Sequence, residues 1–197
     1  MFLKEKLTYS FGLQIFVFFL KNNKTDMKSK NLLLRALEPT DIDLLYKWEN
    51  DSKIWYLSNA VSPISRHVLE EYILSSHQDI YTLKQLRLMI DDVSTCETIG
   101  CIDLFDFDPI NLRAGIGILI SDNQRNKGYA SEALTLLIDY AFNTLNLHQL
   151  YCNITTNNEV SLKLFEKHNF KNIGIKKDWI KLENKWLDEY MFQLIST

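Results

Sequence analysis

The residues best suited to bind an anion lie in the segment 118–131. It begins as an apolar, strand-like run (ILI) and continues as SDNQRNKGYAS, a short loop that leads into a helix. The first turn of a helix carries backbone N–H groups without intrahelical partners beside the positive end of the helix dipole, and this favours a phosphate. Gly128 and Ala130 let the backbone approach a ligand closely. Arg125 and Lys127 add positive charge.

Two common phosphate-binding motifs are absent from this segment. The Walker motif needs a glycine five residues before Gly-Lys-Ser/Thr, and the nicotinamide fingerprint needs two more glycines than are present. Taken alone, the pattern R-x-x-G-x-A also fits an ordinary turn between a strand and a helix. The loop therefore predicts an anion site without naming its ligand.

A second pattern begins at Asn158, thirty residues after Gly128, and reads NEVSLKLFEKHNF. The order R-x-x-G-x-A, helix, strand and N-x-x-S-x-x-L-F-E-K-x-x-F resembles the GNAT superfamily of acetyl-CoA-dependent N-acetyltransferases. The runs IDLFDFDPINLRAGIGILIS and LIDYAFNTLNLHQLYCNI resemble the branch that holds the spermidine and the ribosomal-protein N-terminal acetyltransferases. The resemblance extends from about Leu32 to Leu194.

The resemblance implies a site for acetyl-CoA as co-substrate, with no metal required. The loop 125–131 would wrap the CoA pyrophosphate, and the strand 118–120 would line the pantetheine arm. Asn158 would hydrogen-bond that arm, although the role of a plain helix N-cap explains it too. The helix 159–167 would flank the thiol end. The residues assigned to the cofactor are Ile118, Leu119, Ile120, Arg125, Asn126, Lys127, Gly128, Tyr129, Ala130, Ser131, Asn158 and Phe165.

Two residues depart from the family pattern. Many members carry a tyrosine where this chain has Phe165, and that tyrosine protonates the departing thiolate, whereas phenylalanine has no proton to give. A thiol with a pKa of about 8.5 is a tolerable leaving group unaided, so the loss slows an enzyme without abolishing its activity. Asn169 stands where most relatives have glycine, and asparagine tolerates a left-handed backbone better than most residues do.

The implied reaction is a direct attack of a neutral amine on the thioester carbonyl. Backbone N–H groups of the strand 118–120 would stabilise the oxyanion, and a base must remove the proton of the amine. Asp103 and Asp106 are the candidates for catalysis, and three-residue spacing on one strand predicts that they face opposite sides of the sheet. A solvated strand end explains them as well. Aromatic residues of the first helices could wall an acceptor pocket or simply pack in the core; they are Trp48, Trp55, Tyr56 and Tyr72.

Hydrophobic patterning predicts the elements that must position these residues. Residues 98–107 and 113–120 are expected to form an antiparallel hairpin, and the apolar period changes from two to 3.6 after Gly128. The fold class is therefore mixed α/β, a mainly antiparallel sheet flanked by helices, with the GNAT fold. The other expected strands are 31–37, 85–90, 150–154, 170–175 and 189–194, and the other helices begin near residues 40 and 65 and occupy 159–167.

Composition limits the class of protein. The chain has 197 residues, of which 46% are hydrophobic and 24% charged, as in an ordinary globular domain. Its formal net charge of −3 offers no basic surface for nucleic acid. Three cysteines without a CxxC pair argue against a disulfide framework or a cysteine-built zinc site, and favour the cytoplasm.

Residues 1–26 differ from the rest of the chain. The apolar run FGLQIFVFFL is too short to span a membrane as a helix, which takes about 20 residues, and no small-residue cleavage site follows it. Three interpretations remain: a start placed upstream of the working Met27, an arm that packs on a neighbour, or an export signal. A single domain is expected over 27–197. Its net charge is −5, because the extension carries four lysines against one Glu and one Asp.

The sequence thus predicts a cytoplasmic N-acetyltransferase that acts on a primary amine, with a polyamine such as spermidine as the first acceptor. A protein N-terminus, as in the ribosomal-protein acetyltransferases, is the alternative acceptor, and acidic charge does not choose between two cations. A CoA-binding module that has lost catalysis is the alternative of another class. No nucleic-acid or membrane partner is expected, and a homo-oligomer is left open.

Overall fold

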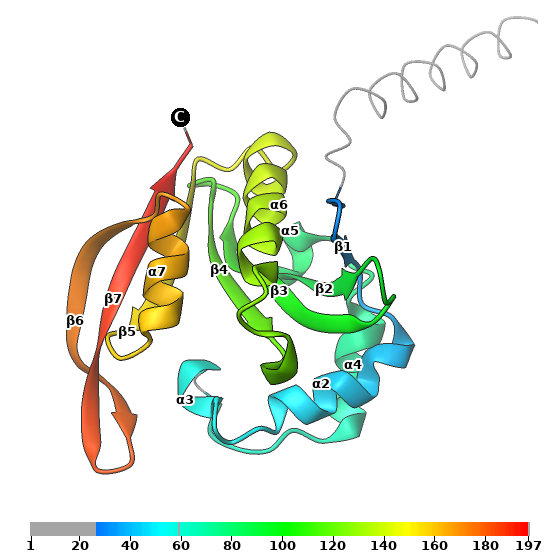
Figure 1. Cartoon of the computed structure of the whole chain (residues 1–197), viewed down its shortest axis with the longest axis horizontal. Coiled ribbons are helices and arrows are strands. Elements are labelled where there is room, and N and C mark those ends of the chain that lie inside the picture. The colour runs from blue at the N-terminus through cyan, green and yellow to red at the C-terminus, as the bar shows by residue number, and fades with distance from the viewer. Residues whose placement is uncertain (1–26, 59, 197) are drawn as a thin grey trace, which may run out of the picture.

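A seven-stranded sheet forms the centre of the molecule (Figure 1). The computed structural model describes residues 27–58 and 60–196. The strands lie in the order β1-β2-β3-β4-β5-β7-β6, and every neighbouring pair is antiparallel except β4 and β5. The strands are β1 (Leu32–Arg35), β2 (Leu86–Asp92), β3 (Thr98–Asp108), β4 (Arg113–Ile120), β5 (Gln149–Thr155), β6 (Lys171–Leu182) and β7 (Lys185–Ile195).

Helices pack on both faces of this sheet (Figure 1). The long helix α6 packs on one face, and α2 and α4 pack on the other. Ser65 caps α4 by accepting a hydrogen bond from the Val68 amide at 3.3 Å. The helices are α2 (Ile42–Glu49), α3 (Trp55–Ser58), α4 (Arg66–Ser75), α5 (Ile80–Leu83), α6 (Tyr129–Asn143) and α7 (Glu159–Lys167), with 3-10 turns η1 (Pro39–Asp41) and η2 (Asp122–Gln124).

The central strands bury side chains on both faces. On β2, Leu88 and Ile90 belong to the core beneath α6, whereas Met89 between them belongs to the core beneath α2 and α4. Successive side chains of a strand point to opposite faces, so a strand covered on both sides reads as a continuous apolar run. Two cores thus hold the central strands firmly.

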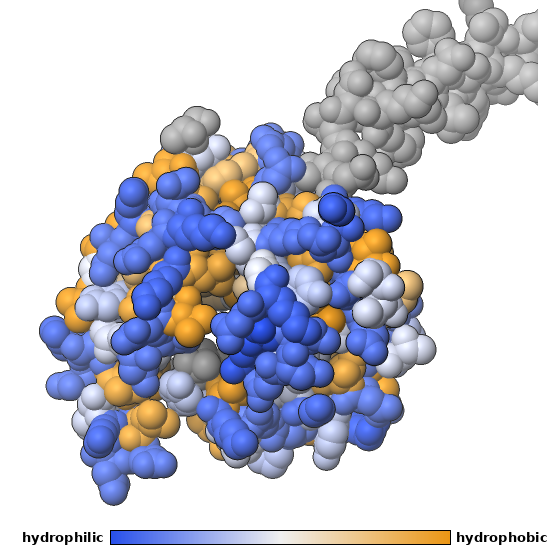
Figure 2. All heavy atoms as spheres, in the orientation of Figure 1, coloured by the Kyte–Doolittle hydropathy of each residue, from blue (hydrophilic) through white to orange (hydrophobic). Residues whose placement is uncertain are grey.

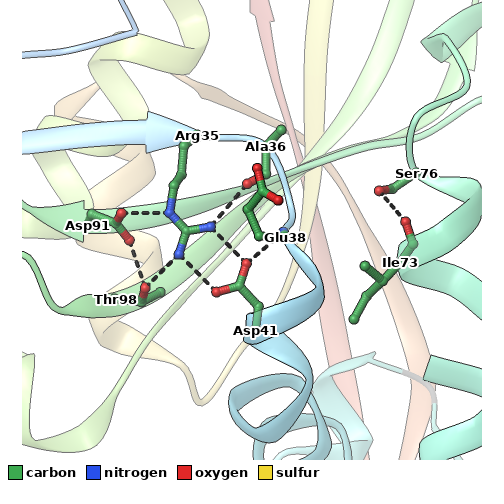
Figure 3. Close-up of polar contacts among 8 residues, drawn as sticks. All are labelled: Arg35, Ala36, Glu38, Asp41, Ile73, Ser76, Asp91 and Thr98. Atoms are coloured by element: carbon green, nitrogen blue, oxygen red, sulfur yellow. Dashed lines mark hydrogen bonds and ion pairs between the residues drawn. The ribbon is translucent and has the colours of Figure 1, made fainter. Parts of the chain in front are cut away.

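Arg35 joins the first strand to the start of the α2 region (Figure 3). Its guanidinium contacts both carboxylate oxygens of Asp41, at 2.7 and 2.8 Å, and its Nε contacts Asp91 on β2 at 2.6 Å. Thr98 on β3 accepts a further hydrogen bond at 2.8 Å. One side chain therefore ties three neighbouring strands to η1.

The structure confirms the predicted fold class and most of its elements. The β3–β4 hairpin is antiparallel as expected, and α7 occupies 159–167 as expected. The last two strands are longer than the predicted 170–175 and 189–194, because β6 is an exposed edge strand whose polar residues hide the alternation. The single-turn helices α3 and α5 were not predicted, since one turn is too short to show a helical period. The extension of residues 1–26 lies outside the described residues.

Candidate active site

The site is an opening in the sheet between β4 and β5. These two strands pair over three residues only, Arg113–Gly115 with Gln149–Tyr151. Beyond that point β4 continues along β3 and β5 continues along β7, so the strands diverge (Figure 1). A cavity of about 170 Å³ lies in this opening. It is lined by Tyr56, Ile116, Gly117, Ile118, Cys152, Asn153, Ile154, Thr155, Asn158, Ser161, Phe165 and Glu189.

The edge of β4 that borders this opening carries backbone groups without a strand partner. The Ser121 amide donates to the Ile99 carbonyl on β3 at 2.9 Å. Antiparallel bonds alternate along a strand, so the N–H and C=O groups of Ile118 and Ile120 point the other way, toward the opening. The Ile120 carbonyl accordingly accepts a hydrogen bond from Arg125 at 3.1 Å. An extended ligand that carries amide groups can therefore pair with this edge as a strand does.

The loop after β4 has the geometry of an anion cradle. Gly128, the residue before α6, has φ of +86°, and a Cβ added to it would meet no atom within 4 Å. Asn126 also has a positive φ, of 63°. No residue in the part of the chain that the structure describes accepts a hydrogen bond from the backbone amides of 126–131. These amides lie at the positive end of the α6 dipole, where a phosphate is stabilised.

The two cations of the loop are held by neighbours. Arg125 contacts the carboxylate of Asp122 at 2.9 Å, and Lys127 donates to the side-chain oxygen of Gln124 at 2.7 Å. Both pairs are exposed, so they cost little to exchange for a ligand. The cationic charge predicted here is present and accessible.

Two predicted cofactor residues of the first turn use their side chains within the protein. The Tyr129 hydroxyl donates to Asp92 at 2.6 Å, and hydrogen bonds from Ser94 and Tyr129 lower the pKa of that carboxyl to about 2. The Ser131 hydroxyl contacts His168 at 2.8 Å and Lys167 at 3.1 Å. Tyr129 and Ser131 would therefore bind an anion through their backbone amides and not through their side chains.

A second, larger hollow of about 580 Å³ borders the end of β4. It is lined by the predicted residues Leu119, Ile120 and Arg125, together with side chains of α2 and the segment after it. The two hollows thus follow β4 in succession, one beside 116–118 and the other beside 119–125. On the face that carries α6 and α7, Figure 2 shows hydrophobic side chains exposed between hydrophilic groups.

The predicted residues Asn158, just before α7, and Phe165, within it, both line the cavity. The side-chain oxygen of Asn158 accepts a hydrogen bond from the Ser161 amide at 3.2 Å, so this residue is the N-cap of α7. Phe165 is 4% exposed and packs edge-to-face on Phe170, with the ring centroids 5.0 Å apart. Its ring is therefore fixed at the wall of the cavity.

The predicted catalytic acids lie outside both hollows. Asp103 forms a two-point ion pair with Arg87, at 2.7 and 3.0 Å, and Arg87 also contacts Glu49 at 2.5 Å. Asp106 lies in a β-bulge with φ of 48° and accepts a hydrogen bond from Tyr151 at 3.3 Å. Because the bulge breaks the regular alternation of β3, the spacing argument for opposite faces does not apply. A catalytic role for either acid stays a prediction.

The sequence analysis did not assign Thr155, from the end of β5, or Glu189, from β7, to the reaction, and both line the cavity. Tyr56 of α3, one of the aromatic residues named as a possible wall of the acceptor pocket, also lines it. A signal existed for Glu189, since it is a charged residue inside the apolar run of a closing strand. The described ranges contain no group of His, Cys, Asp or Glu arranged to hold a metal ion, and no helix there is long and apolar enough to cross a membrane.

Comparison with known proteins identifies the class. Residues 31–171 match the acetyltransferase (GNAT) domain family, and the chain belongs to it. The protein is thus a GNAT N-acetyltransferase.

Individual relatives match most of the chain. It is similar to the uncharacterised N-acetyltransferase p20 of Bacillus licheniformis, with 31% identity over 85% of this chain and 94% of that protein. It is also similar to the spermidine N(1)-acetyltransferase of Vibrio cholerae, with 26% identity over 74% and 82%. A crystal structure of spermidine N-acetyltransferase from Vibrio cholerae in complex with CoA and spermine shares the fold, with a TM-score of 0.75 and 24% identity, covering 85% of this chain and 96% of the other.

Proposed function

We propose that this protein transfers the acetyl group of acetyl-CoA to a primary amine of a polyamine such as spermidine. One observation supports this function most: the unpaired edge of β4 leads from the amide-rich loop at α6 to the cavity between β4 and β5. A ligand that carries phosphate at one end and amide groups along an arm would fit the loop, the strand edge and the cavity in that order. Acetyl-CoA has both, with its thioester at the far end of the arm.

The loop and the strand edge would divide the binding of acetyl-CoA between them. The free amides of 126–131 would hold the pyrophosphate, and Arg125 and Lys127 would add charge. The outward-facing groups of Ile118 and Ile120 would pair with the amides of the pantetheine arm. The thioester would then reach the cavity beside Phe165 and the N-cap of α7.

The chemistry requires an amine, a polarised carbonyl and a leaving thiolate. An amide N–H of β4, most directly that of Ile118, would stabilise the oxyanion that forms during attack. Phe165 supplies no proton, so the thiolate would leave without a general acid at that position. The thiolate is a weak enough base to do so at a reduced rate.

A cationic acceptor is favoured by charge. The cluster beneath α2 and α4 places the two carboxylates of Glu49 and Asp103 around a single cation, Arg87, and so keeps a net negative charge. The domain 27–197 carries a net charge of −5. Relatives named spermidine N(1)-acetyltransferases, and the related solved structure that holds spermine, support a polyamine as the acceptor.

A panel of amines tests this function. The full chain is incubated with acetyl-CoA and, separately, with spermidine, spermine, free lysine and N-terminal peptides of ribosomal proteins, and thiol release is followed. We expect the highest kcat/KM with spermidine or spermine. Acetylation of the peptides but not of the polyamines would show that the acceptor is a protein N-terminus. Binding of acetyl-CoA without acetylation of any amine would indicate a CoA-binding module without catalysis.

We also expect the protein to form a homo-oligomer. Large hydrophobic side chains lie exposed on the β6–β7 hairpin, with Trp179 and Trp186 each 57% exposed and Ile173 50% exposed. Several large apolar side chains exposed on one hairpin are a feature of interaction sites. Light scattering of the full chain checks this expectation, and a monomer at micromolar concentration would contradict it.

A further inference from the structure

We propose that the carboxylate of Glu189 is the general base that removes the proton of the acceptor amine. The inference rests on the proposed function, because it assigns a step of that reaction to a residue of the same cavity. The roles proposed for the loop and for the β4 edge in binding acetyl-CoA stay the same. Its support is the position of Glu189, the bonding of its two oxygens and a neighbouring hydroxyl without a partner.

Glu189 lies in the wall opposite β4. It is placed on β7 directly beside Thr155 at the end of β5, and both residues line the cavity whose other wall is Ile116–Ile118. Glu189 is only 9% exposed. A carboxylate is rarely buried to this extent without a partner or a function. The cavity also reaches Tyr56 of α3 and Phe165 of α7.

One oxygen of Glu189 is occupied and the other is not. Lys176 of β6 donates to Oε2 at 2.7 Å and also to the side-chain oxygen of Asn153 at 3.0 Å. Among the described residues none donates a hydrogen bond to Oε1. The cation balances the buried charge, while Oε1 keeps its lone pairs for a proton. The other ionisable groups that line the cavity are Tyr56 and Cys152.

Thr155 gives a second observation that points to a ligand. Its hydroxyl is buried and has no hydrogen-bond partner in the described part of the chain, and the residue is 3% exposed. A buried hydroxyl without a partner is costly and calls for an explanation. An acceptor nitrogen or a water in the cavity would satisfy it next to the Glu189 carboxylate. Two polar groups would thus converge on one atom.

Asp103 has no carboxylate oxygen left to accept a proton. Both of its oxygens are bonded to Arg87, and the residue does not line the cavity. Accepting a proton there would break a two-point ion pair, which is unfavourable when the pair is largely buried. Glu189 can accept a proton on Oε1 without losing its contact with Lys176. The geometry therefore favours Glu189 over Asp103, one of the two acids predicted from the sequence.

The ammonium R–NH3⁺ gives one proton to Glu189 and becomes R–NH2, whose lone pair forms the C–N bond with the thioester carbon. The C–S bond then breaks and CoA leaves as the thiolate. The second proton of the nitrogen goes to that thiolate, which gives the amide and the free thiol. Glu189 returns its proton to water, so one proton is released per turnover.

Glu189→Gln tests the proposal, because it keeps the shape of the side chain and removes the base. With spermidine and saturating acetyl-CoA, we expect kcat to fall by about 10²–10⁴ at pH 7 while the affinity for acetyl-CoA, measured by calorimetry, is unchanged. The deficit should narrow as the pH approaches 10, because a large fraction of an amine with a pKa of about 10 is then already neutral. A purely structural defect would lower the rate equally at every pH.

Matched variants complete the experiment. Glu183→Gln, in the exposed turn of the same β6–β7 hairpin, should leave both the rate and the pH profile unchanged. If Glu189→Gln does not fold, Glu189→Asp takes its place; it retains the base at a shorter reach, and we expect a lower rate with the wild-type pH profile. An acceptor of lower pKa should restore activity to Glu189→Gln.

Three results would overturn the proposal in different ways. If Glu189→Gln, or in its absence Glu189→Asp, acetylates spermidine at the wild-type rate near pH 7, the base assignment is wrong and the proposed function stands. If the wild-type chain binds acetyl-CoA but acetylates no amine, the proposed function and the base assignment fall together. A deficit of Glu189→Gln that is constant from pH 7 to 10 would reduce Glu189 to a structural residue.

Discussion

Gly128 shows how one residue prepares the loop for a ligand. A left-handed φ at the residue before α6 suits glycine, and the space into which a Cβ would project is open. Nothing in the described protein occupies that space, which adjoins the free amides of the first turn. The proposed pyrophosphate site accounts for both features.

Gly128→Ala separates binding from folding. A left-handed alanine costs about 1 kcal/mol, so we expect a small fall in melting temperature, but at least a tenfold loss of acetyl-CoA affinity, because the methyl group enters the proposed phosphate site. Calorimetry and thermal melts measure the two effects. Gly174→Ala is the control, since a Cβ there also meets nothing within 4 Å but lies on β6. Unchanged affinity in a folded Gly128→Ala protein would contradict the pyrophosphate assignment.

Adding a hydroxyl group at Phe165 tests whether the thiolate leaves without a general acid. The ring of Phe165 is held at the cavity wall by the edge-to-face contact with Phe170, so Phe165→Tyr adds a hydroxyl where the family pattern has one. We expect kcat to rise by up to about tenfold with unchanged affinity for acetyl-CoA, because a general acid then protonates the thiolate. Steady-state kinetics measure this. A fall in kcat would mean that the hydroxyl disturbs the packing and that another group already supplies the proton.

Among the elements, the connection between β1 and η1 depends on Arg35. Burial by itself raises the pKa of Asp41, but hydrogen bonds from Arg35 and from the Glu38 amide outweigh this, and the pKa lies below its usual value of 3.8. A lowered carboxyl pKa contributes stability above the unfolded pKa, and this stability is lost as the pH falls through the folded value. The Arg35–Asp41 pair should therefore stabilise the fold at neutral pH and lose its effect in acid.

Arg35→Met tests this connection. The Asp41 side chain is 4% exposed, so removing its cation should cost about 2–3 kcal/mol at pH 7. The difference from wild type should be constant from pH 5 to 8 and shrink below pH 4, as Asp41 becomes neutral. Arg66→Met is the control, because its pair with Asp43 is 51% and 76% exposed and should cost less than 1 kcal/mol. Denaturant unfolding measures the loss of stability in both variants. An equal loss in Arg35→Met and Arg66→Met would contradict a special role of the Arg35–Asp41 pair.

The elements also show what the sequence could predict. The helices α6 and α7 and the β3–β4 hairpin were predictable, because each is long and strongly periodic or ends at a clear break. The full length of β6 was not, since an edge strand faces water and Lys176 and Lys177 interrupt its alternation. The proposed cofactor loop was predictable because it is one contiguous segment. Glu189, Thr155 and Tyr56 come from three separate segments, and only the folded sheet brings them together.

At the scale of the whole molecule, the partial pairing of β4 with β5 makes the site. The sheet is continuous at one end, through three paired residues, and open at the other. Two cores hold β4 from both faces, so the edge stays in place although it has no strand partner. A ligand that pairs with this edge binds a preformed surface and does not have to order it.

Removing residues 1–26 tests where the domain begins. Met27 accepts a hydrogen bond from the Leu34 amide at 2.7 Å, and Asn31 donates to Glu132 of α6 at 3.0 Å, so the contacts of the domain are present from Met27 onward. We expect a protein of residues 27–197 to fold, to melt at the same temperature as the full chain and to bind acetyl-CoA equally well. Thermal melts, size exclusion and calorimetry compare the two. A collapse of the shorter protein would show that the extension is part of the fold.

The central claim is that acetyl groups pass from acetyl-CoA to a polyamine. It is tested most directly by incubating the full chain with acetyl-CoA labelled in the acetyl group and with spermidine, and then analysing the products by mass spectrometry. We predict singly acetylated spermidine that carries the label, formed in equal amount with free CoA thiol. Release of thiol without labelled spermidine, or no reaction at an enzyme concentration that binds acetyl-CoA, would contradict the claim.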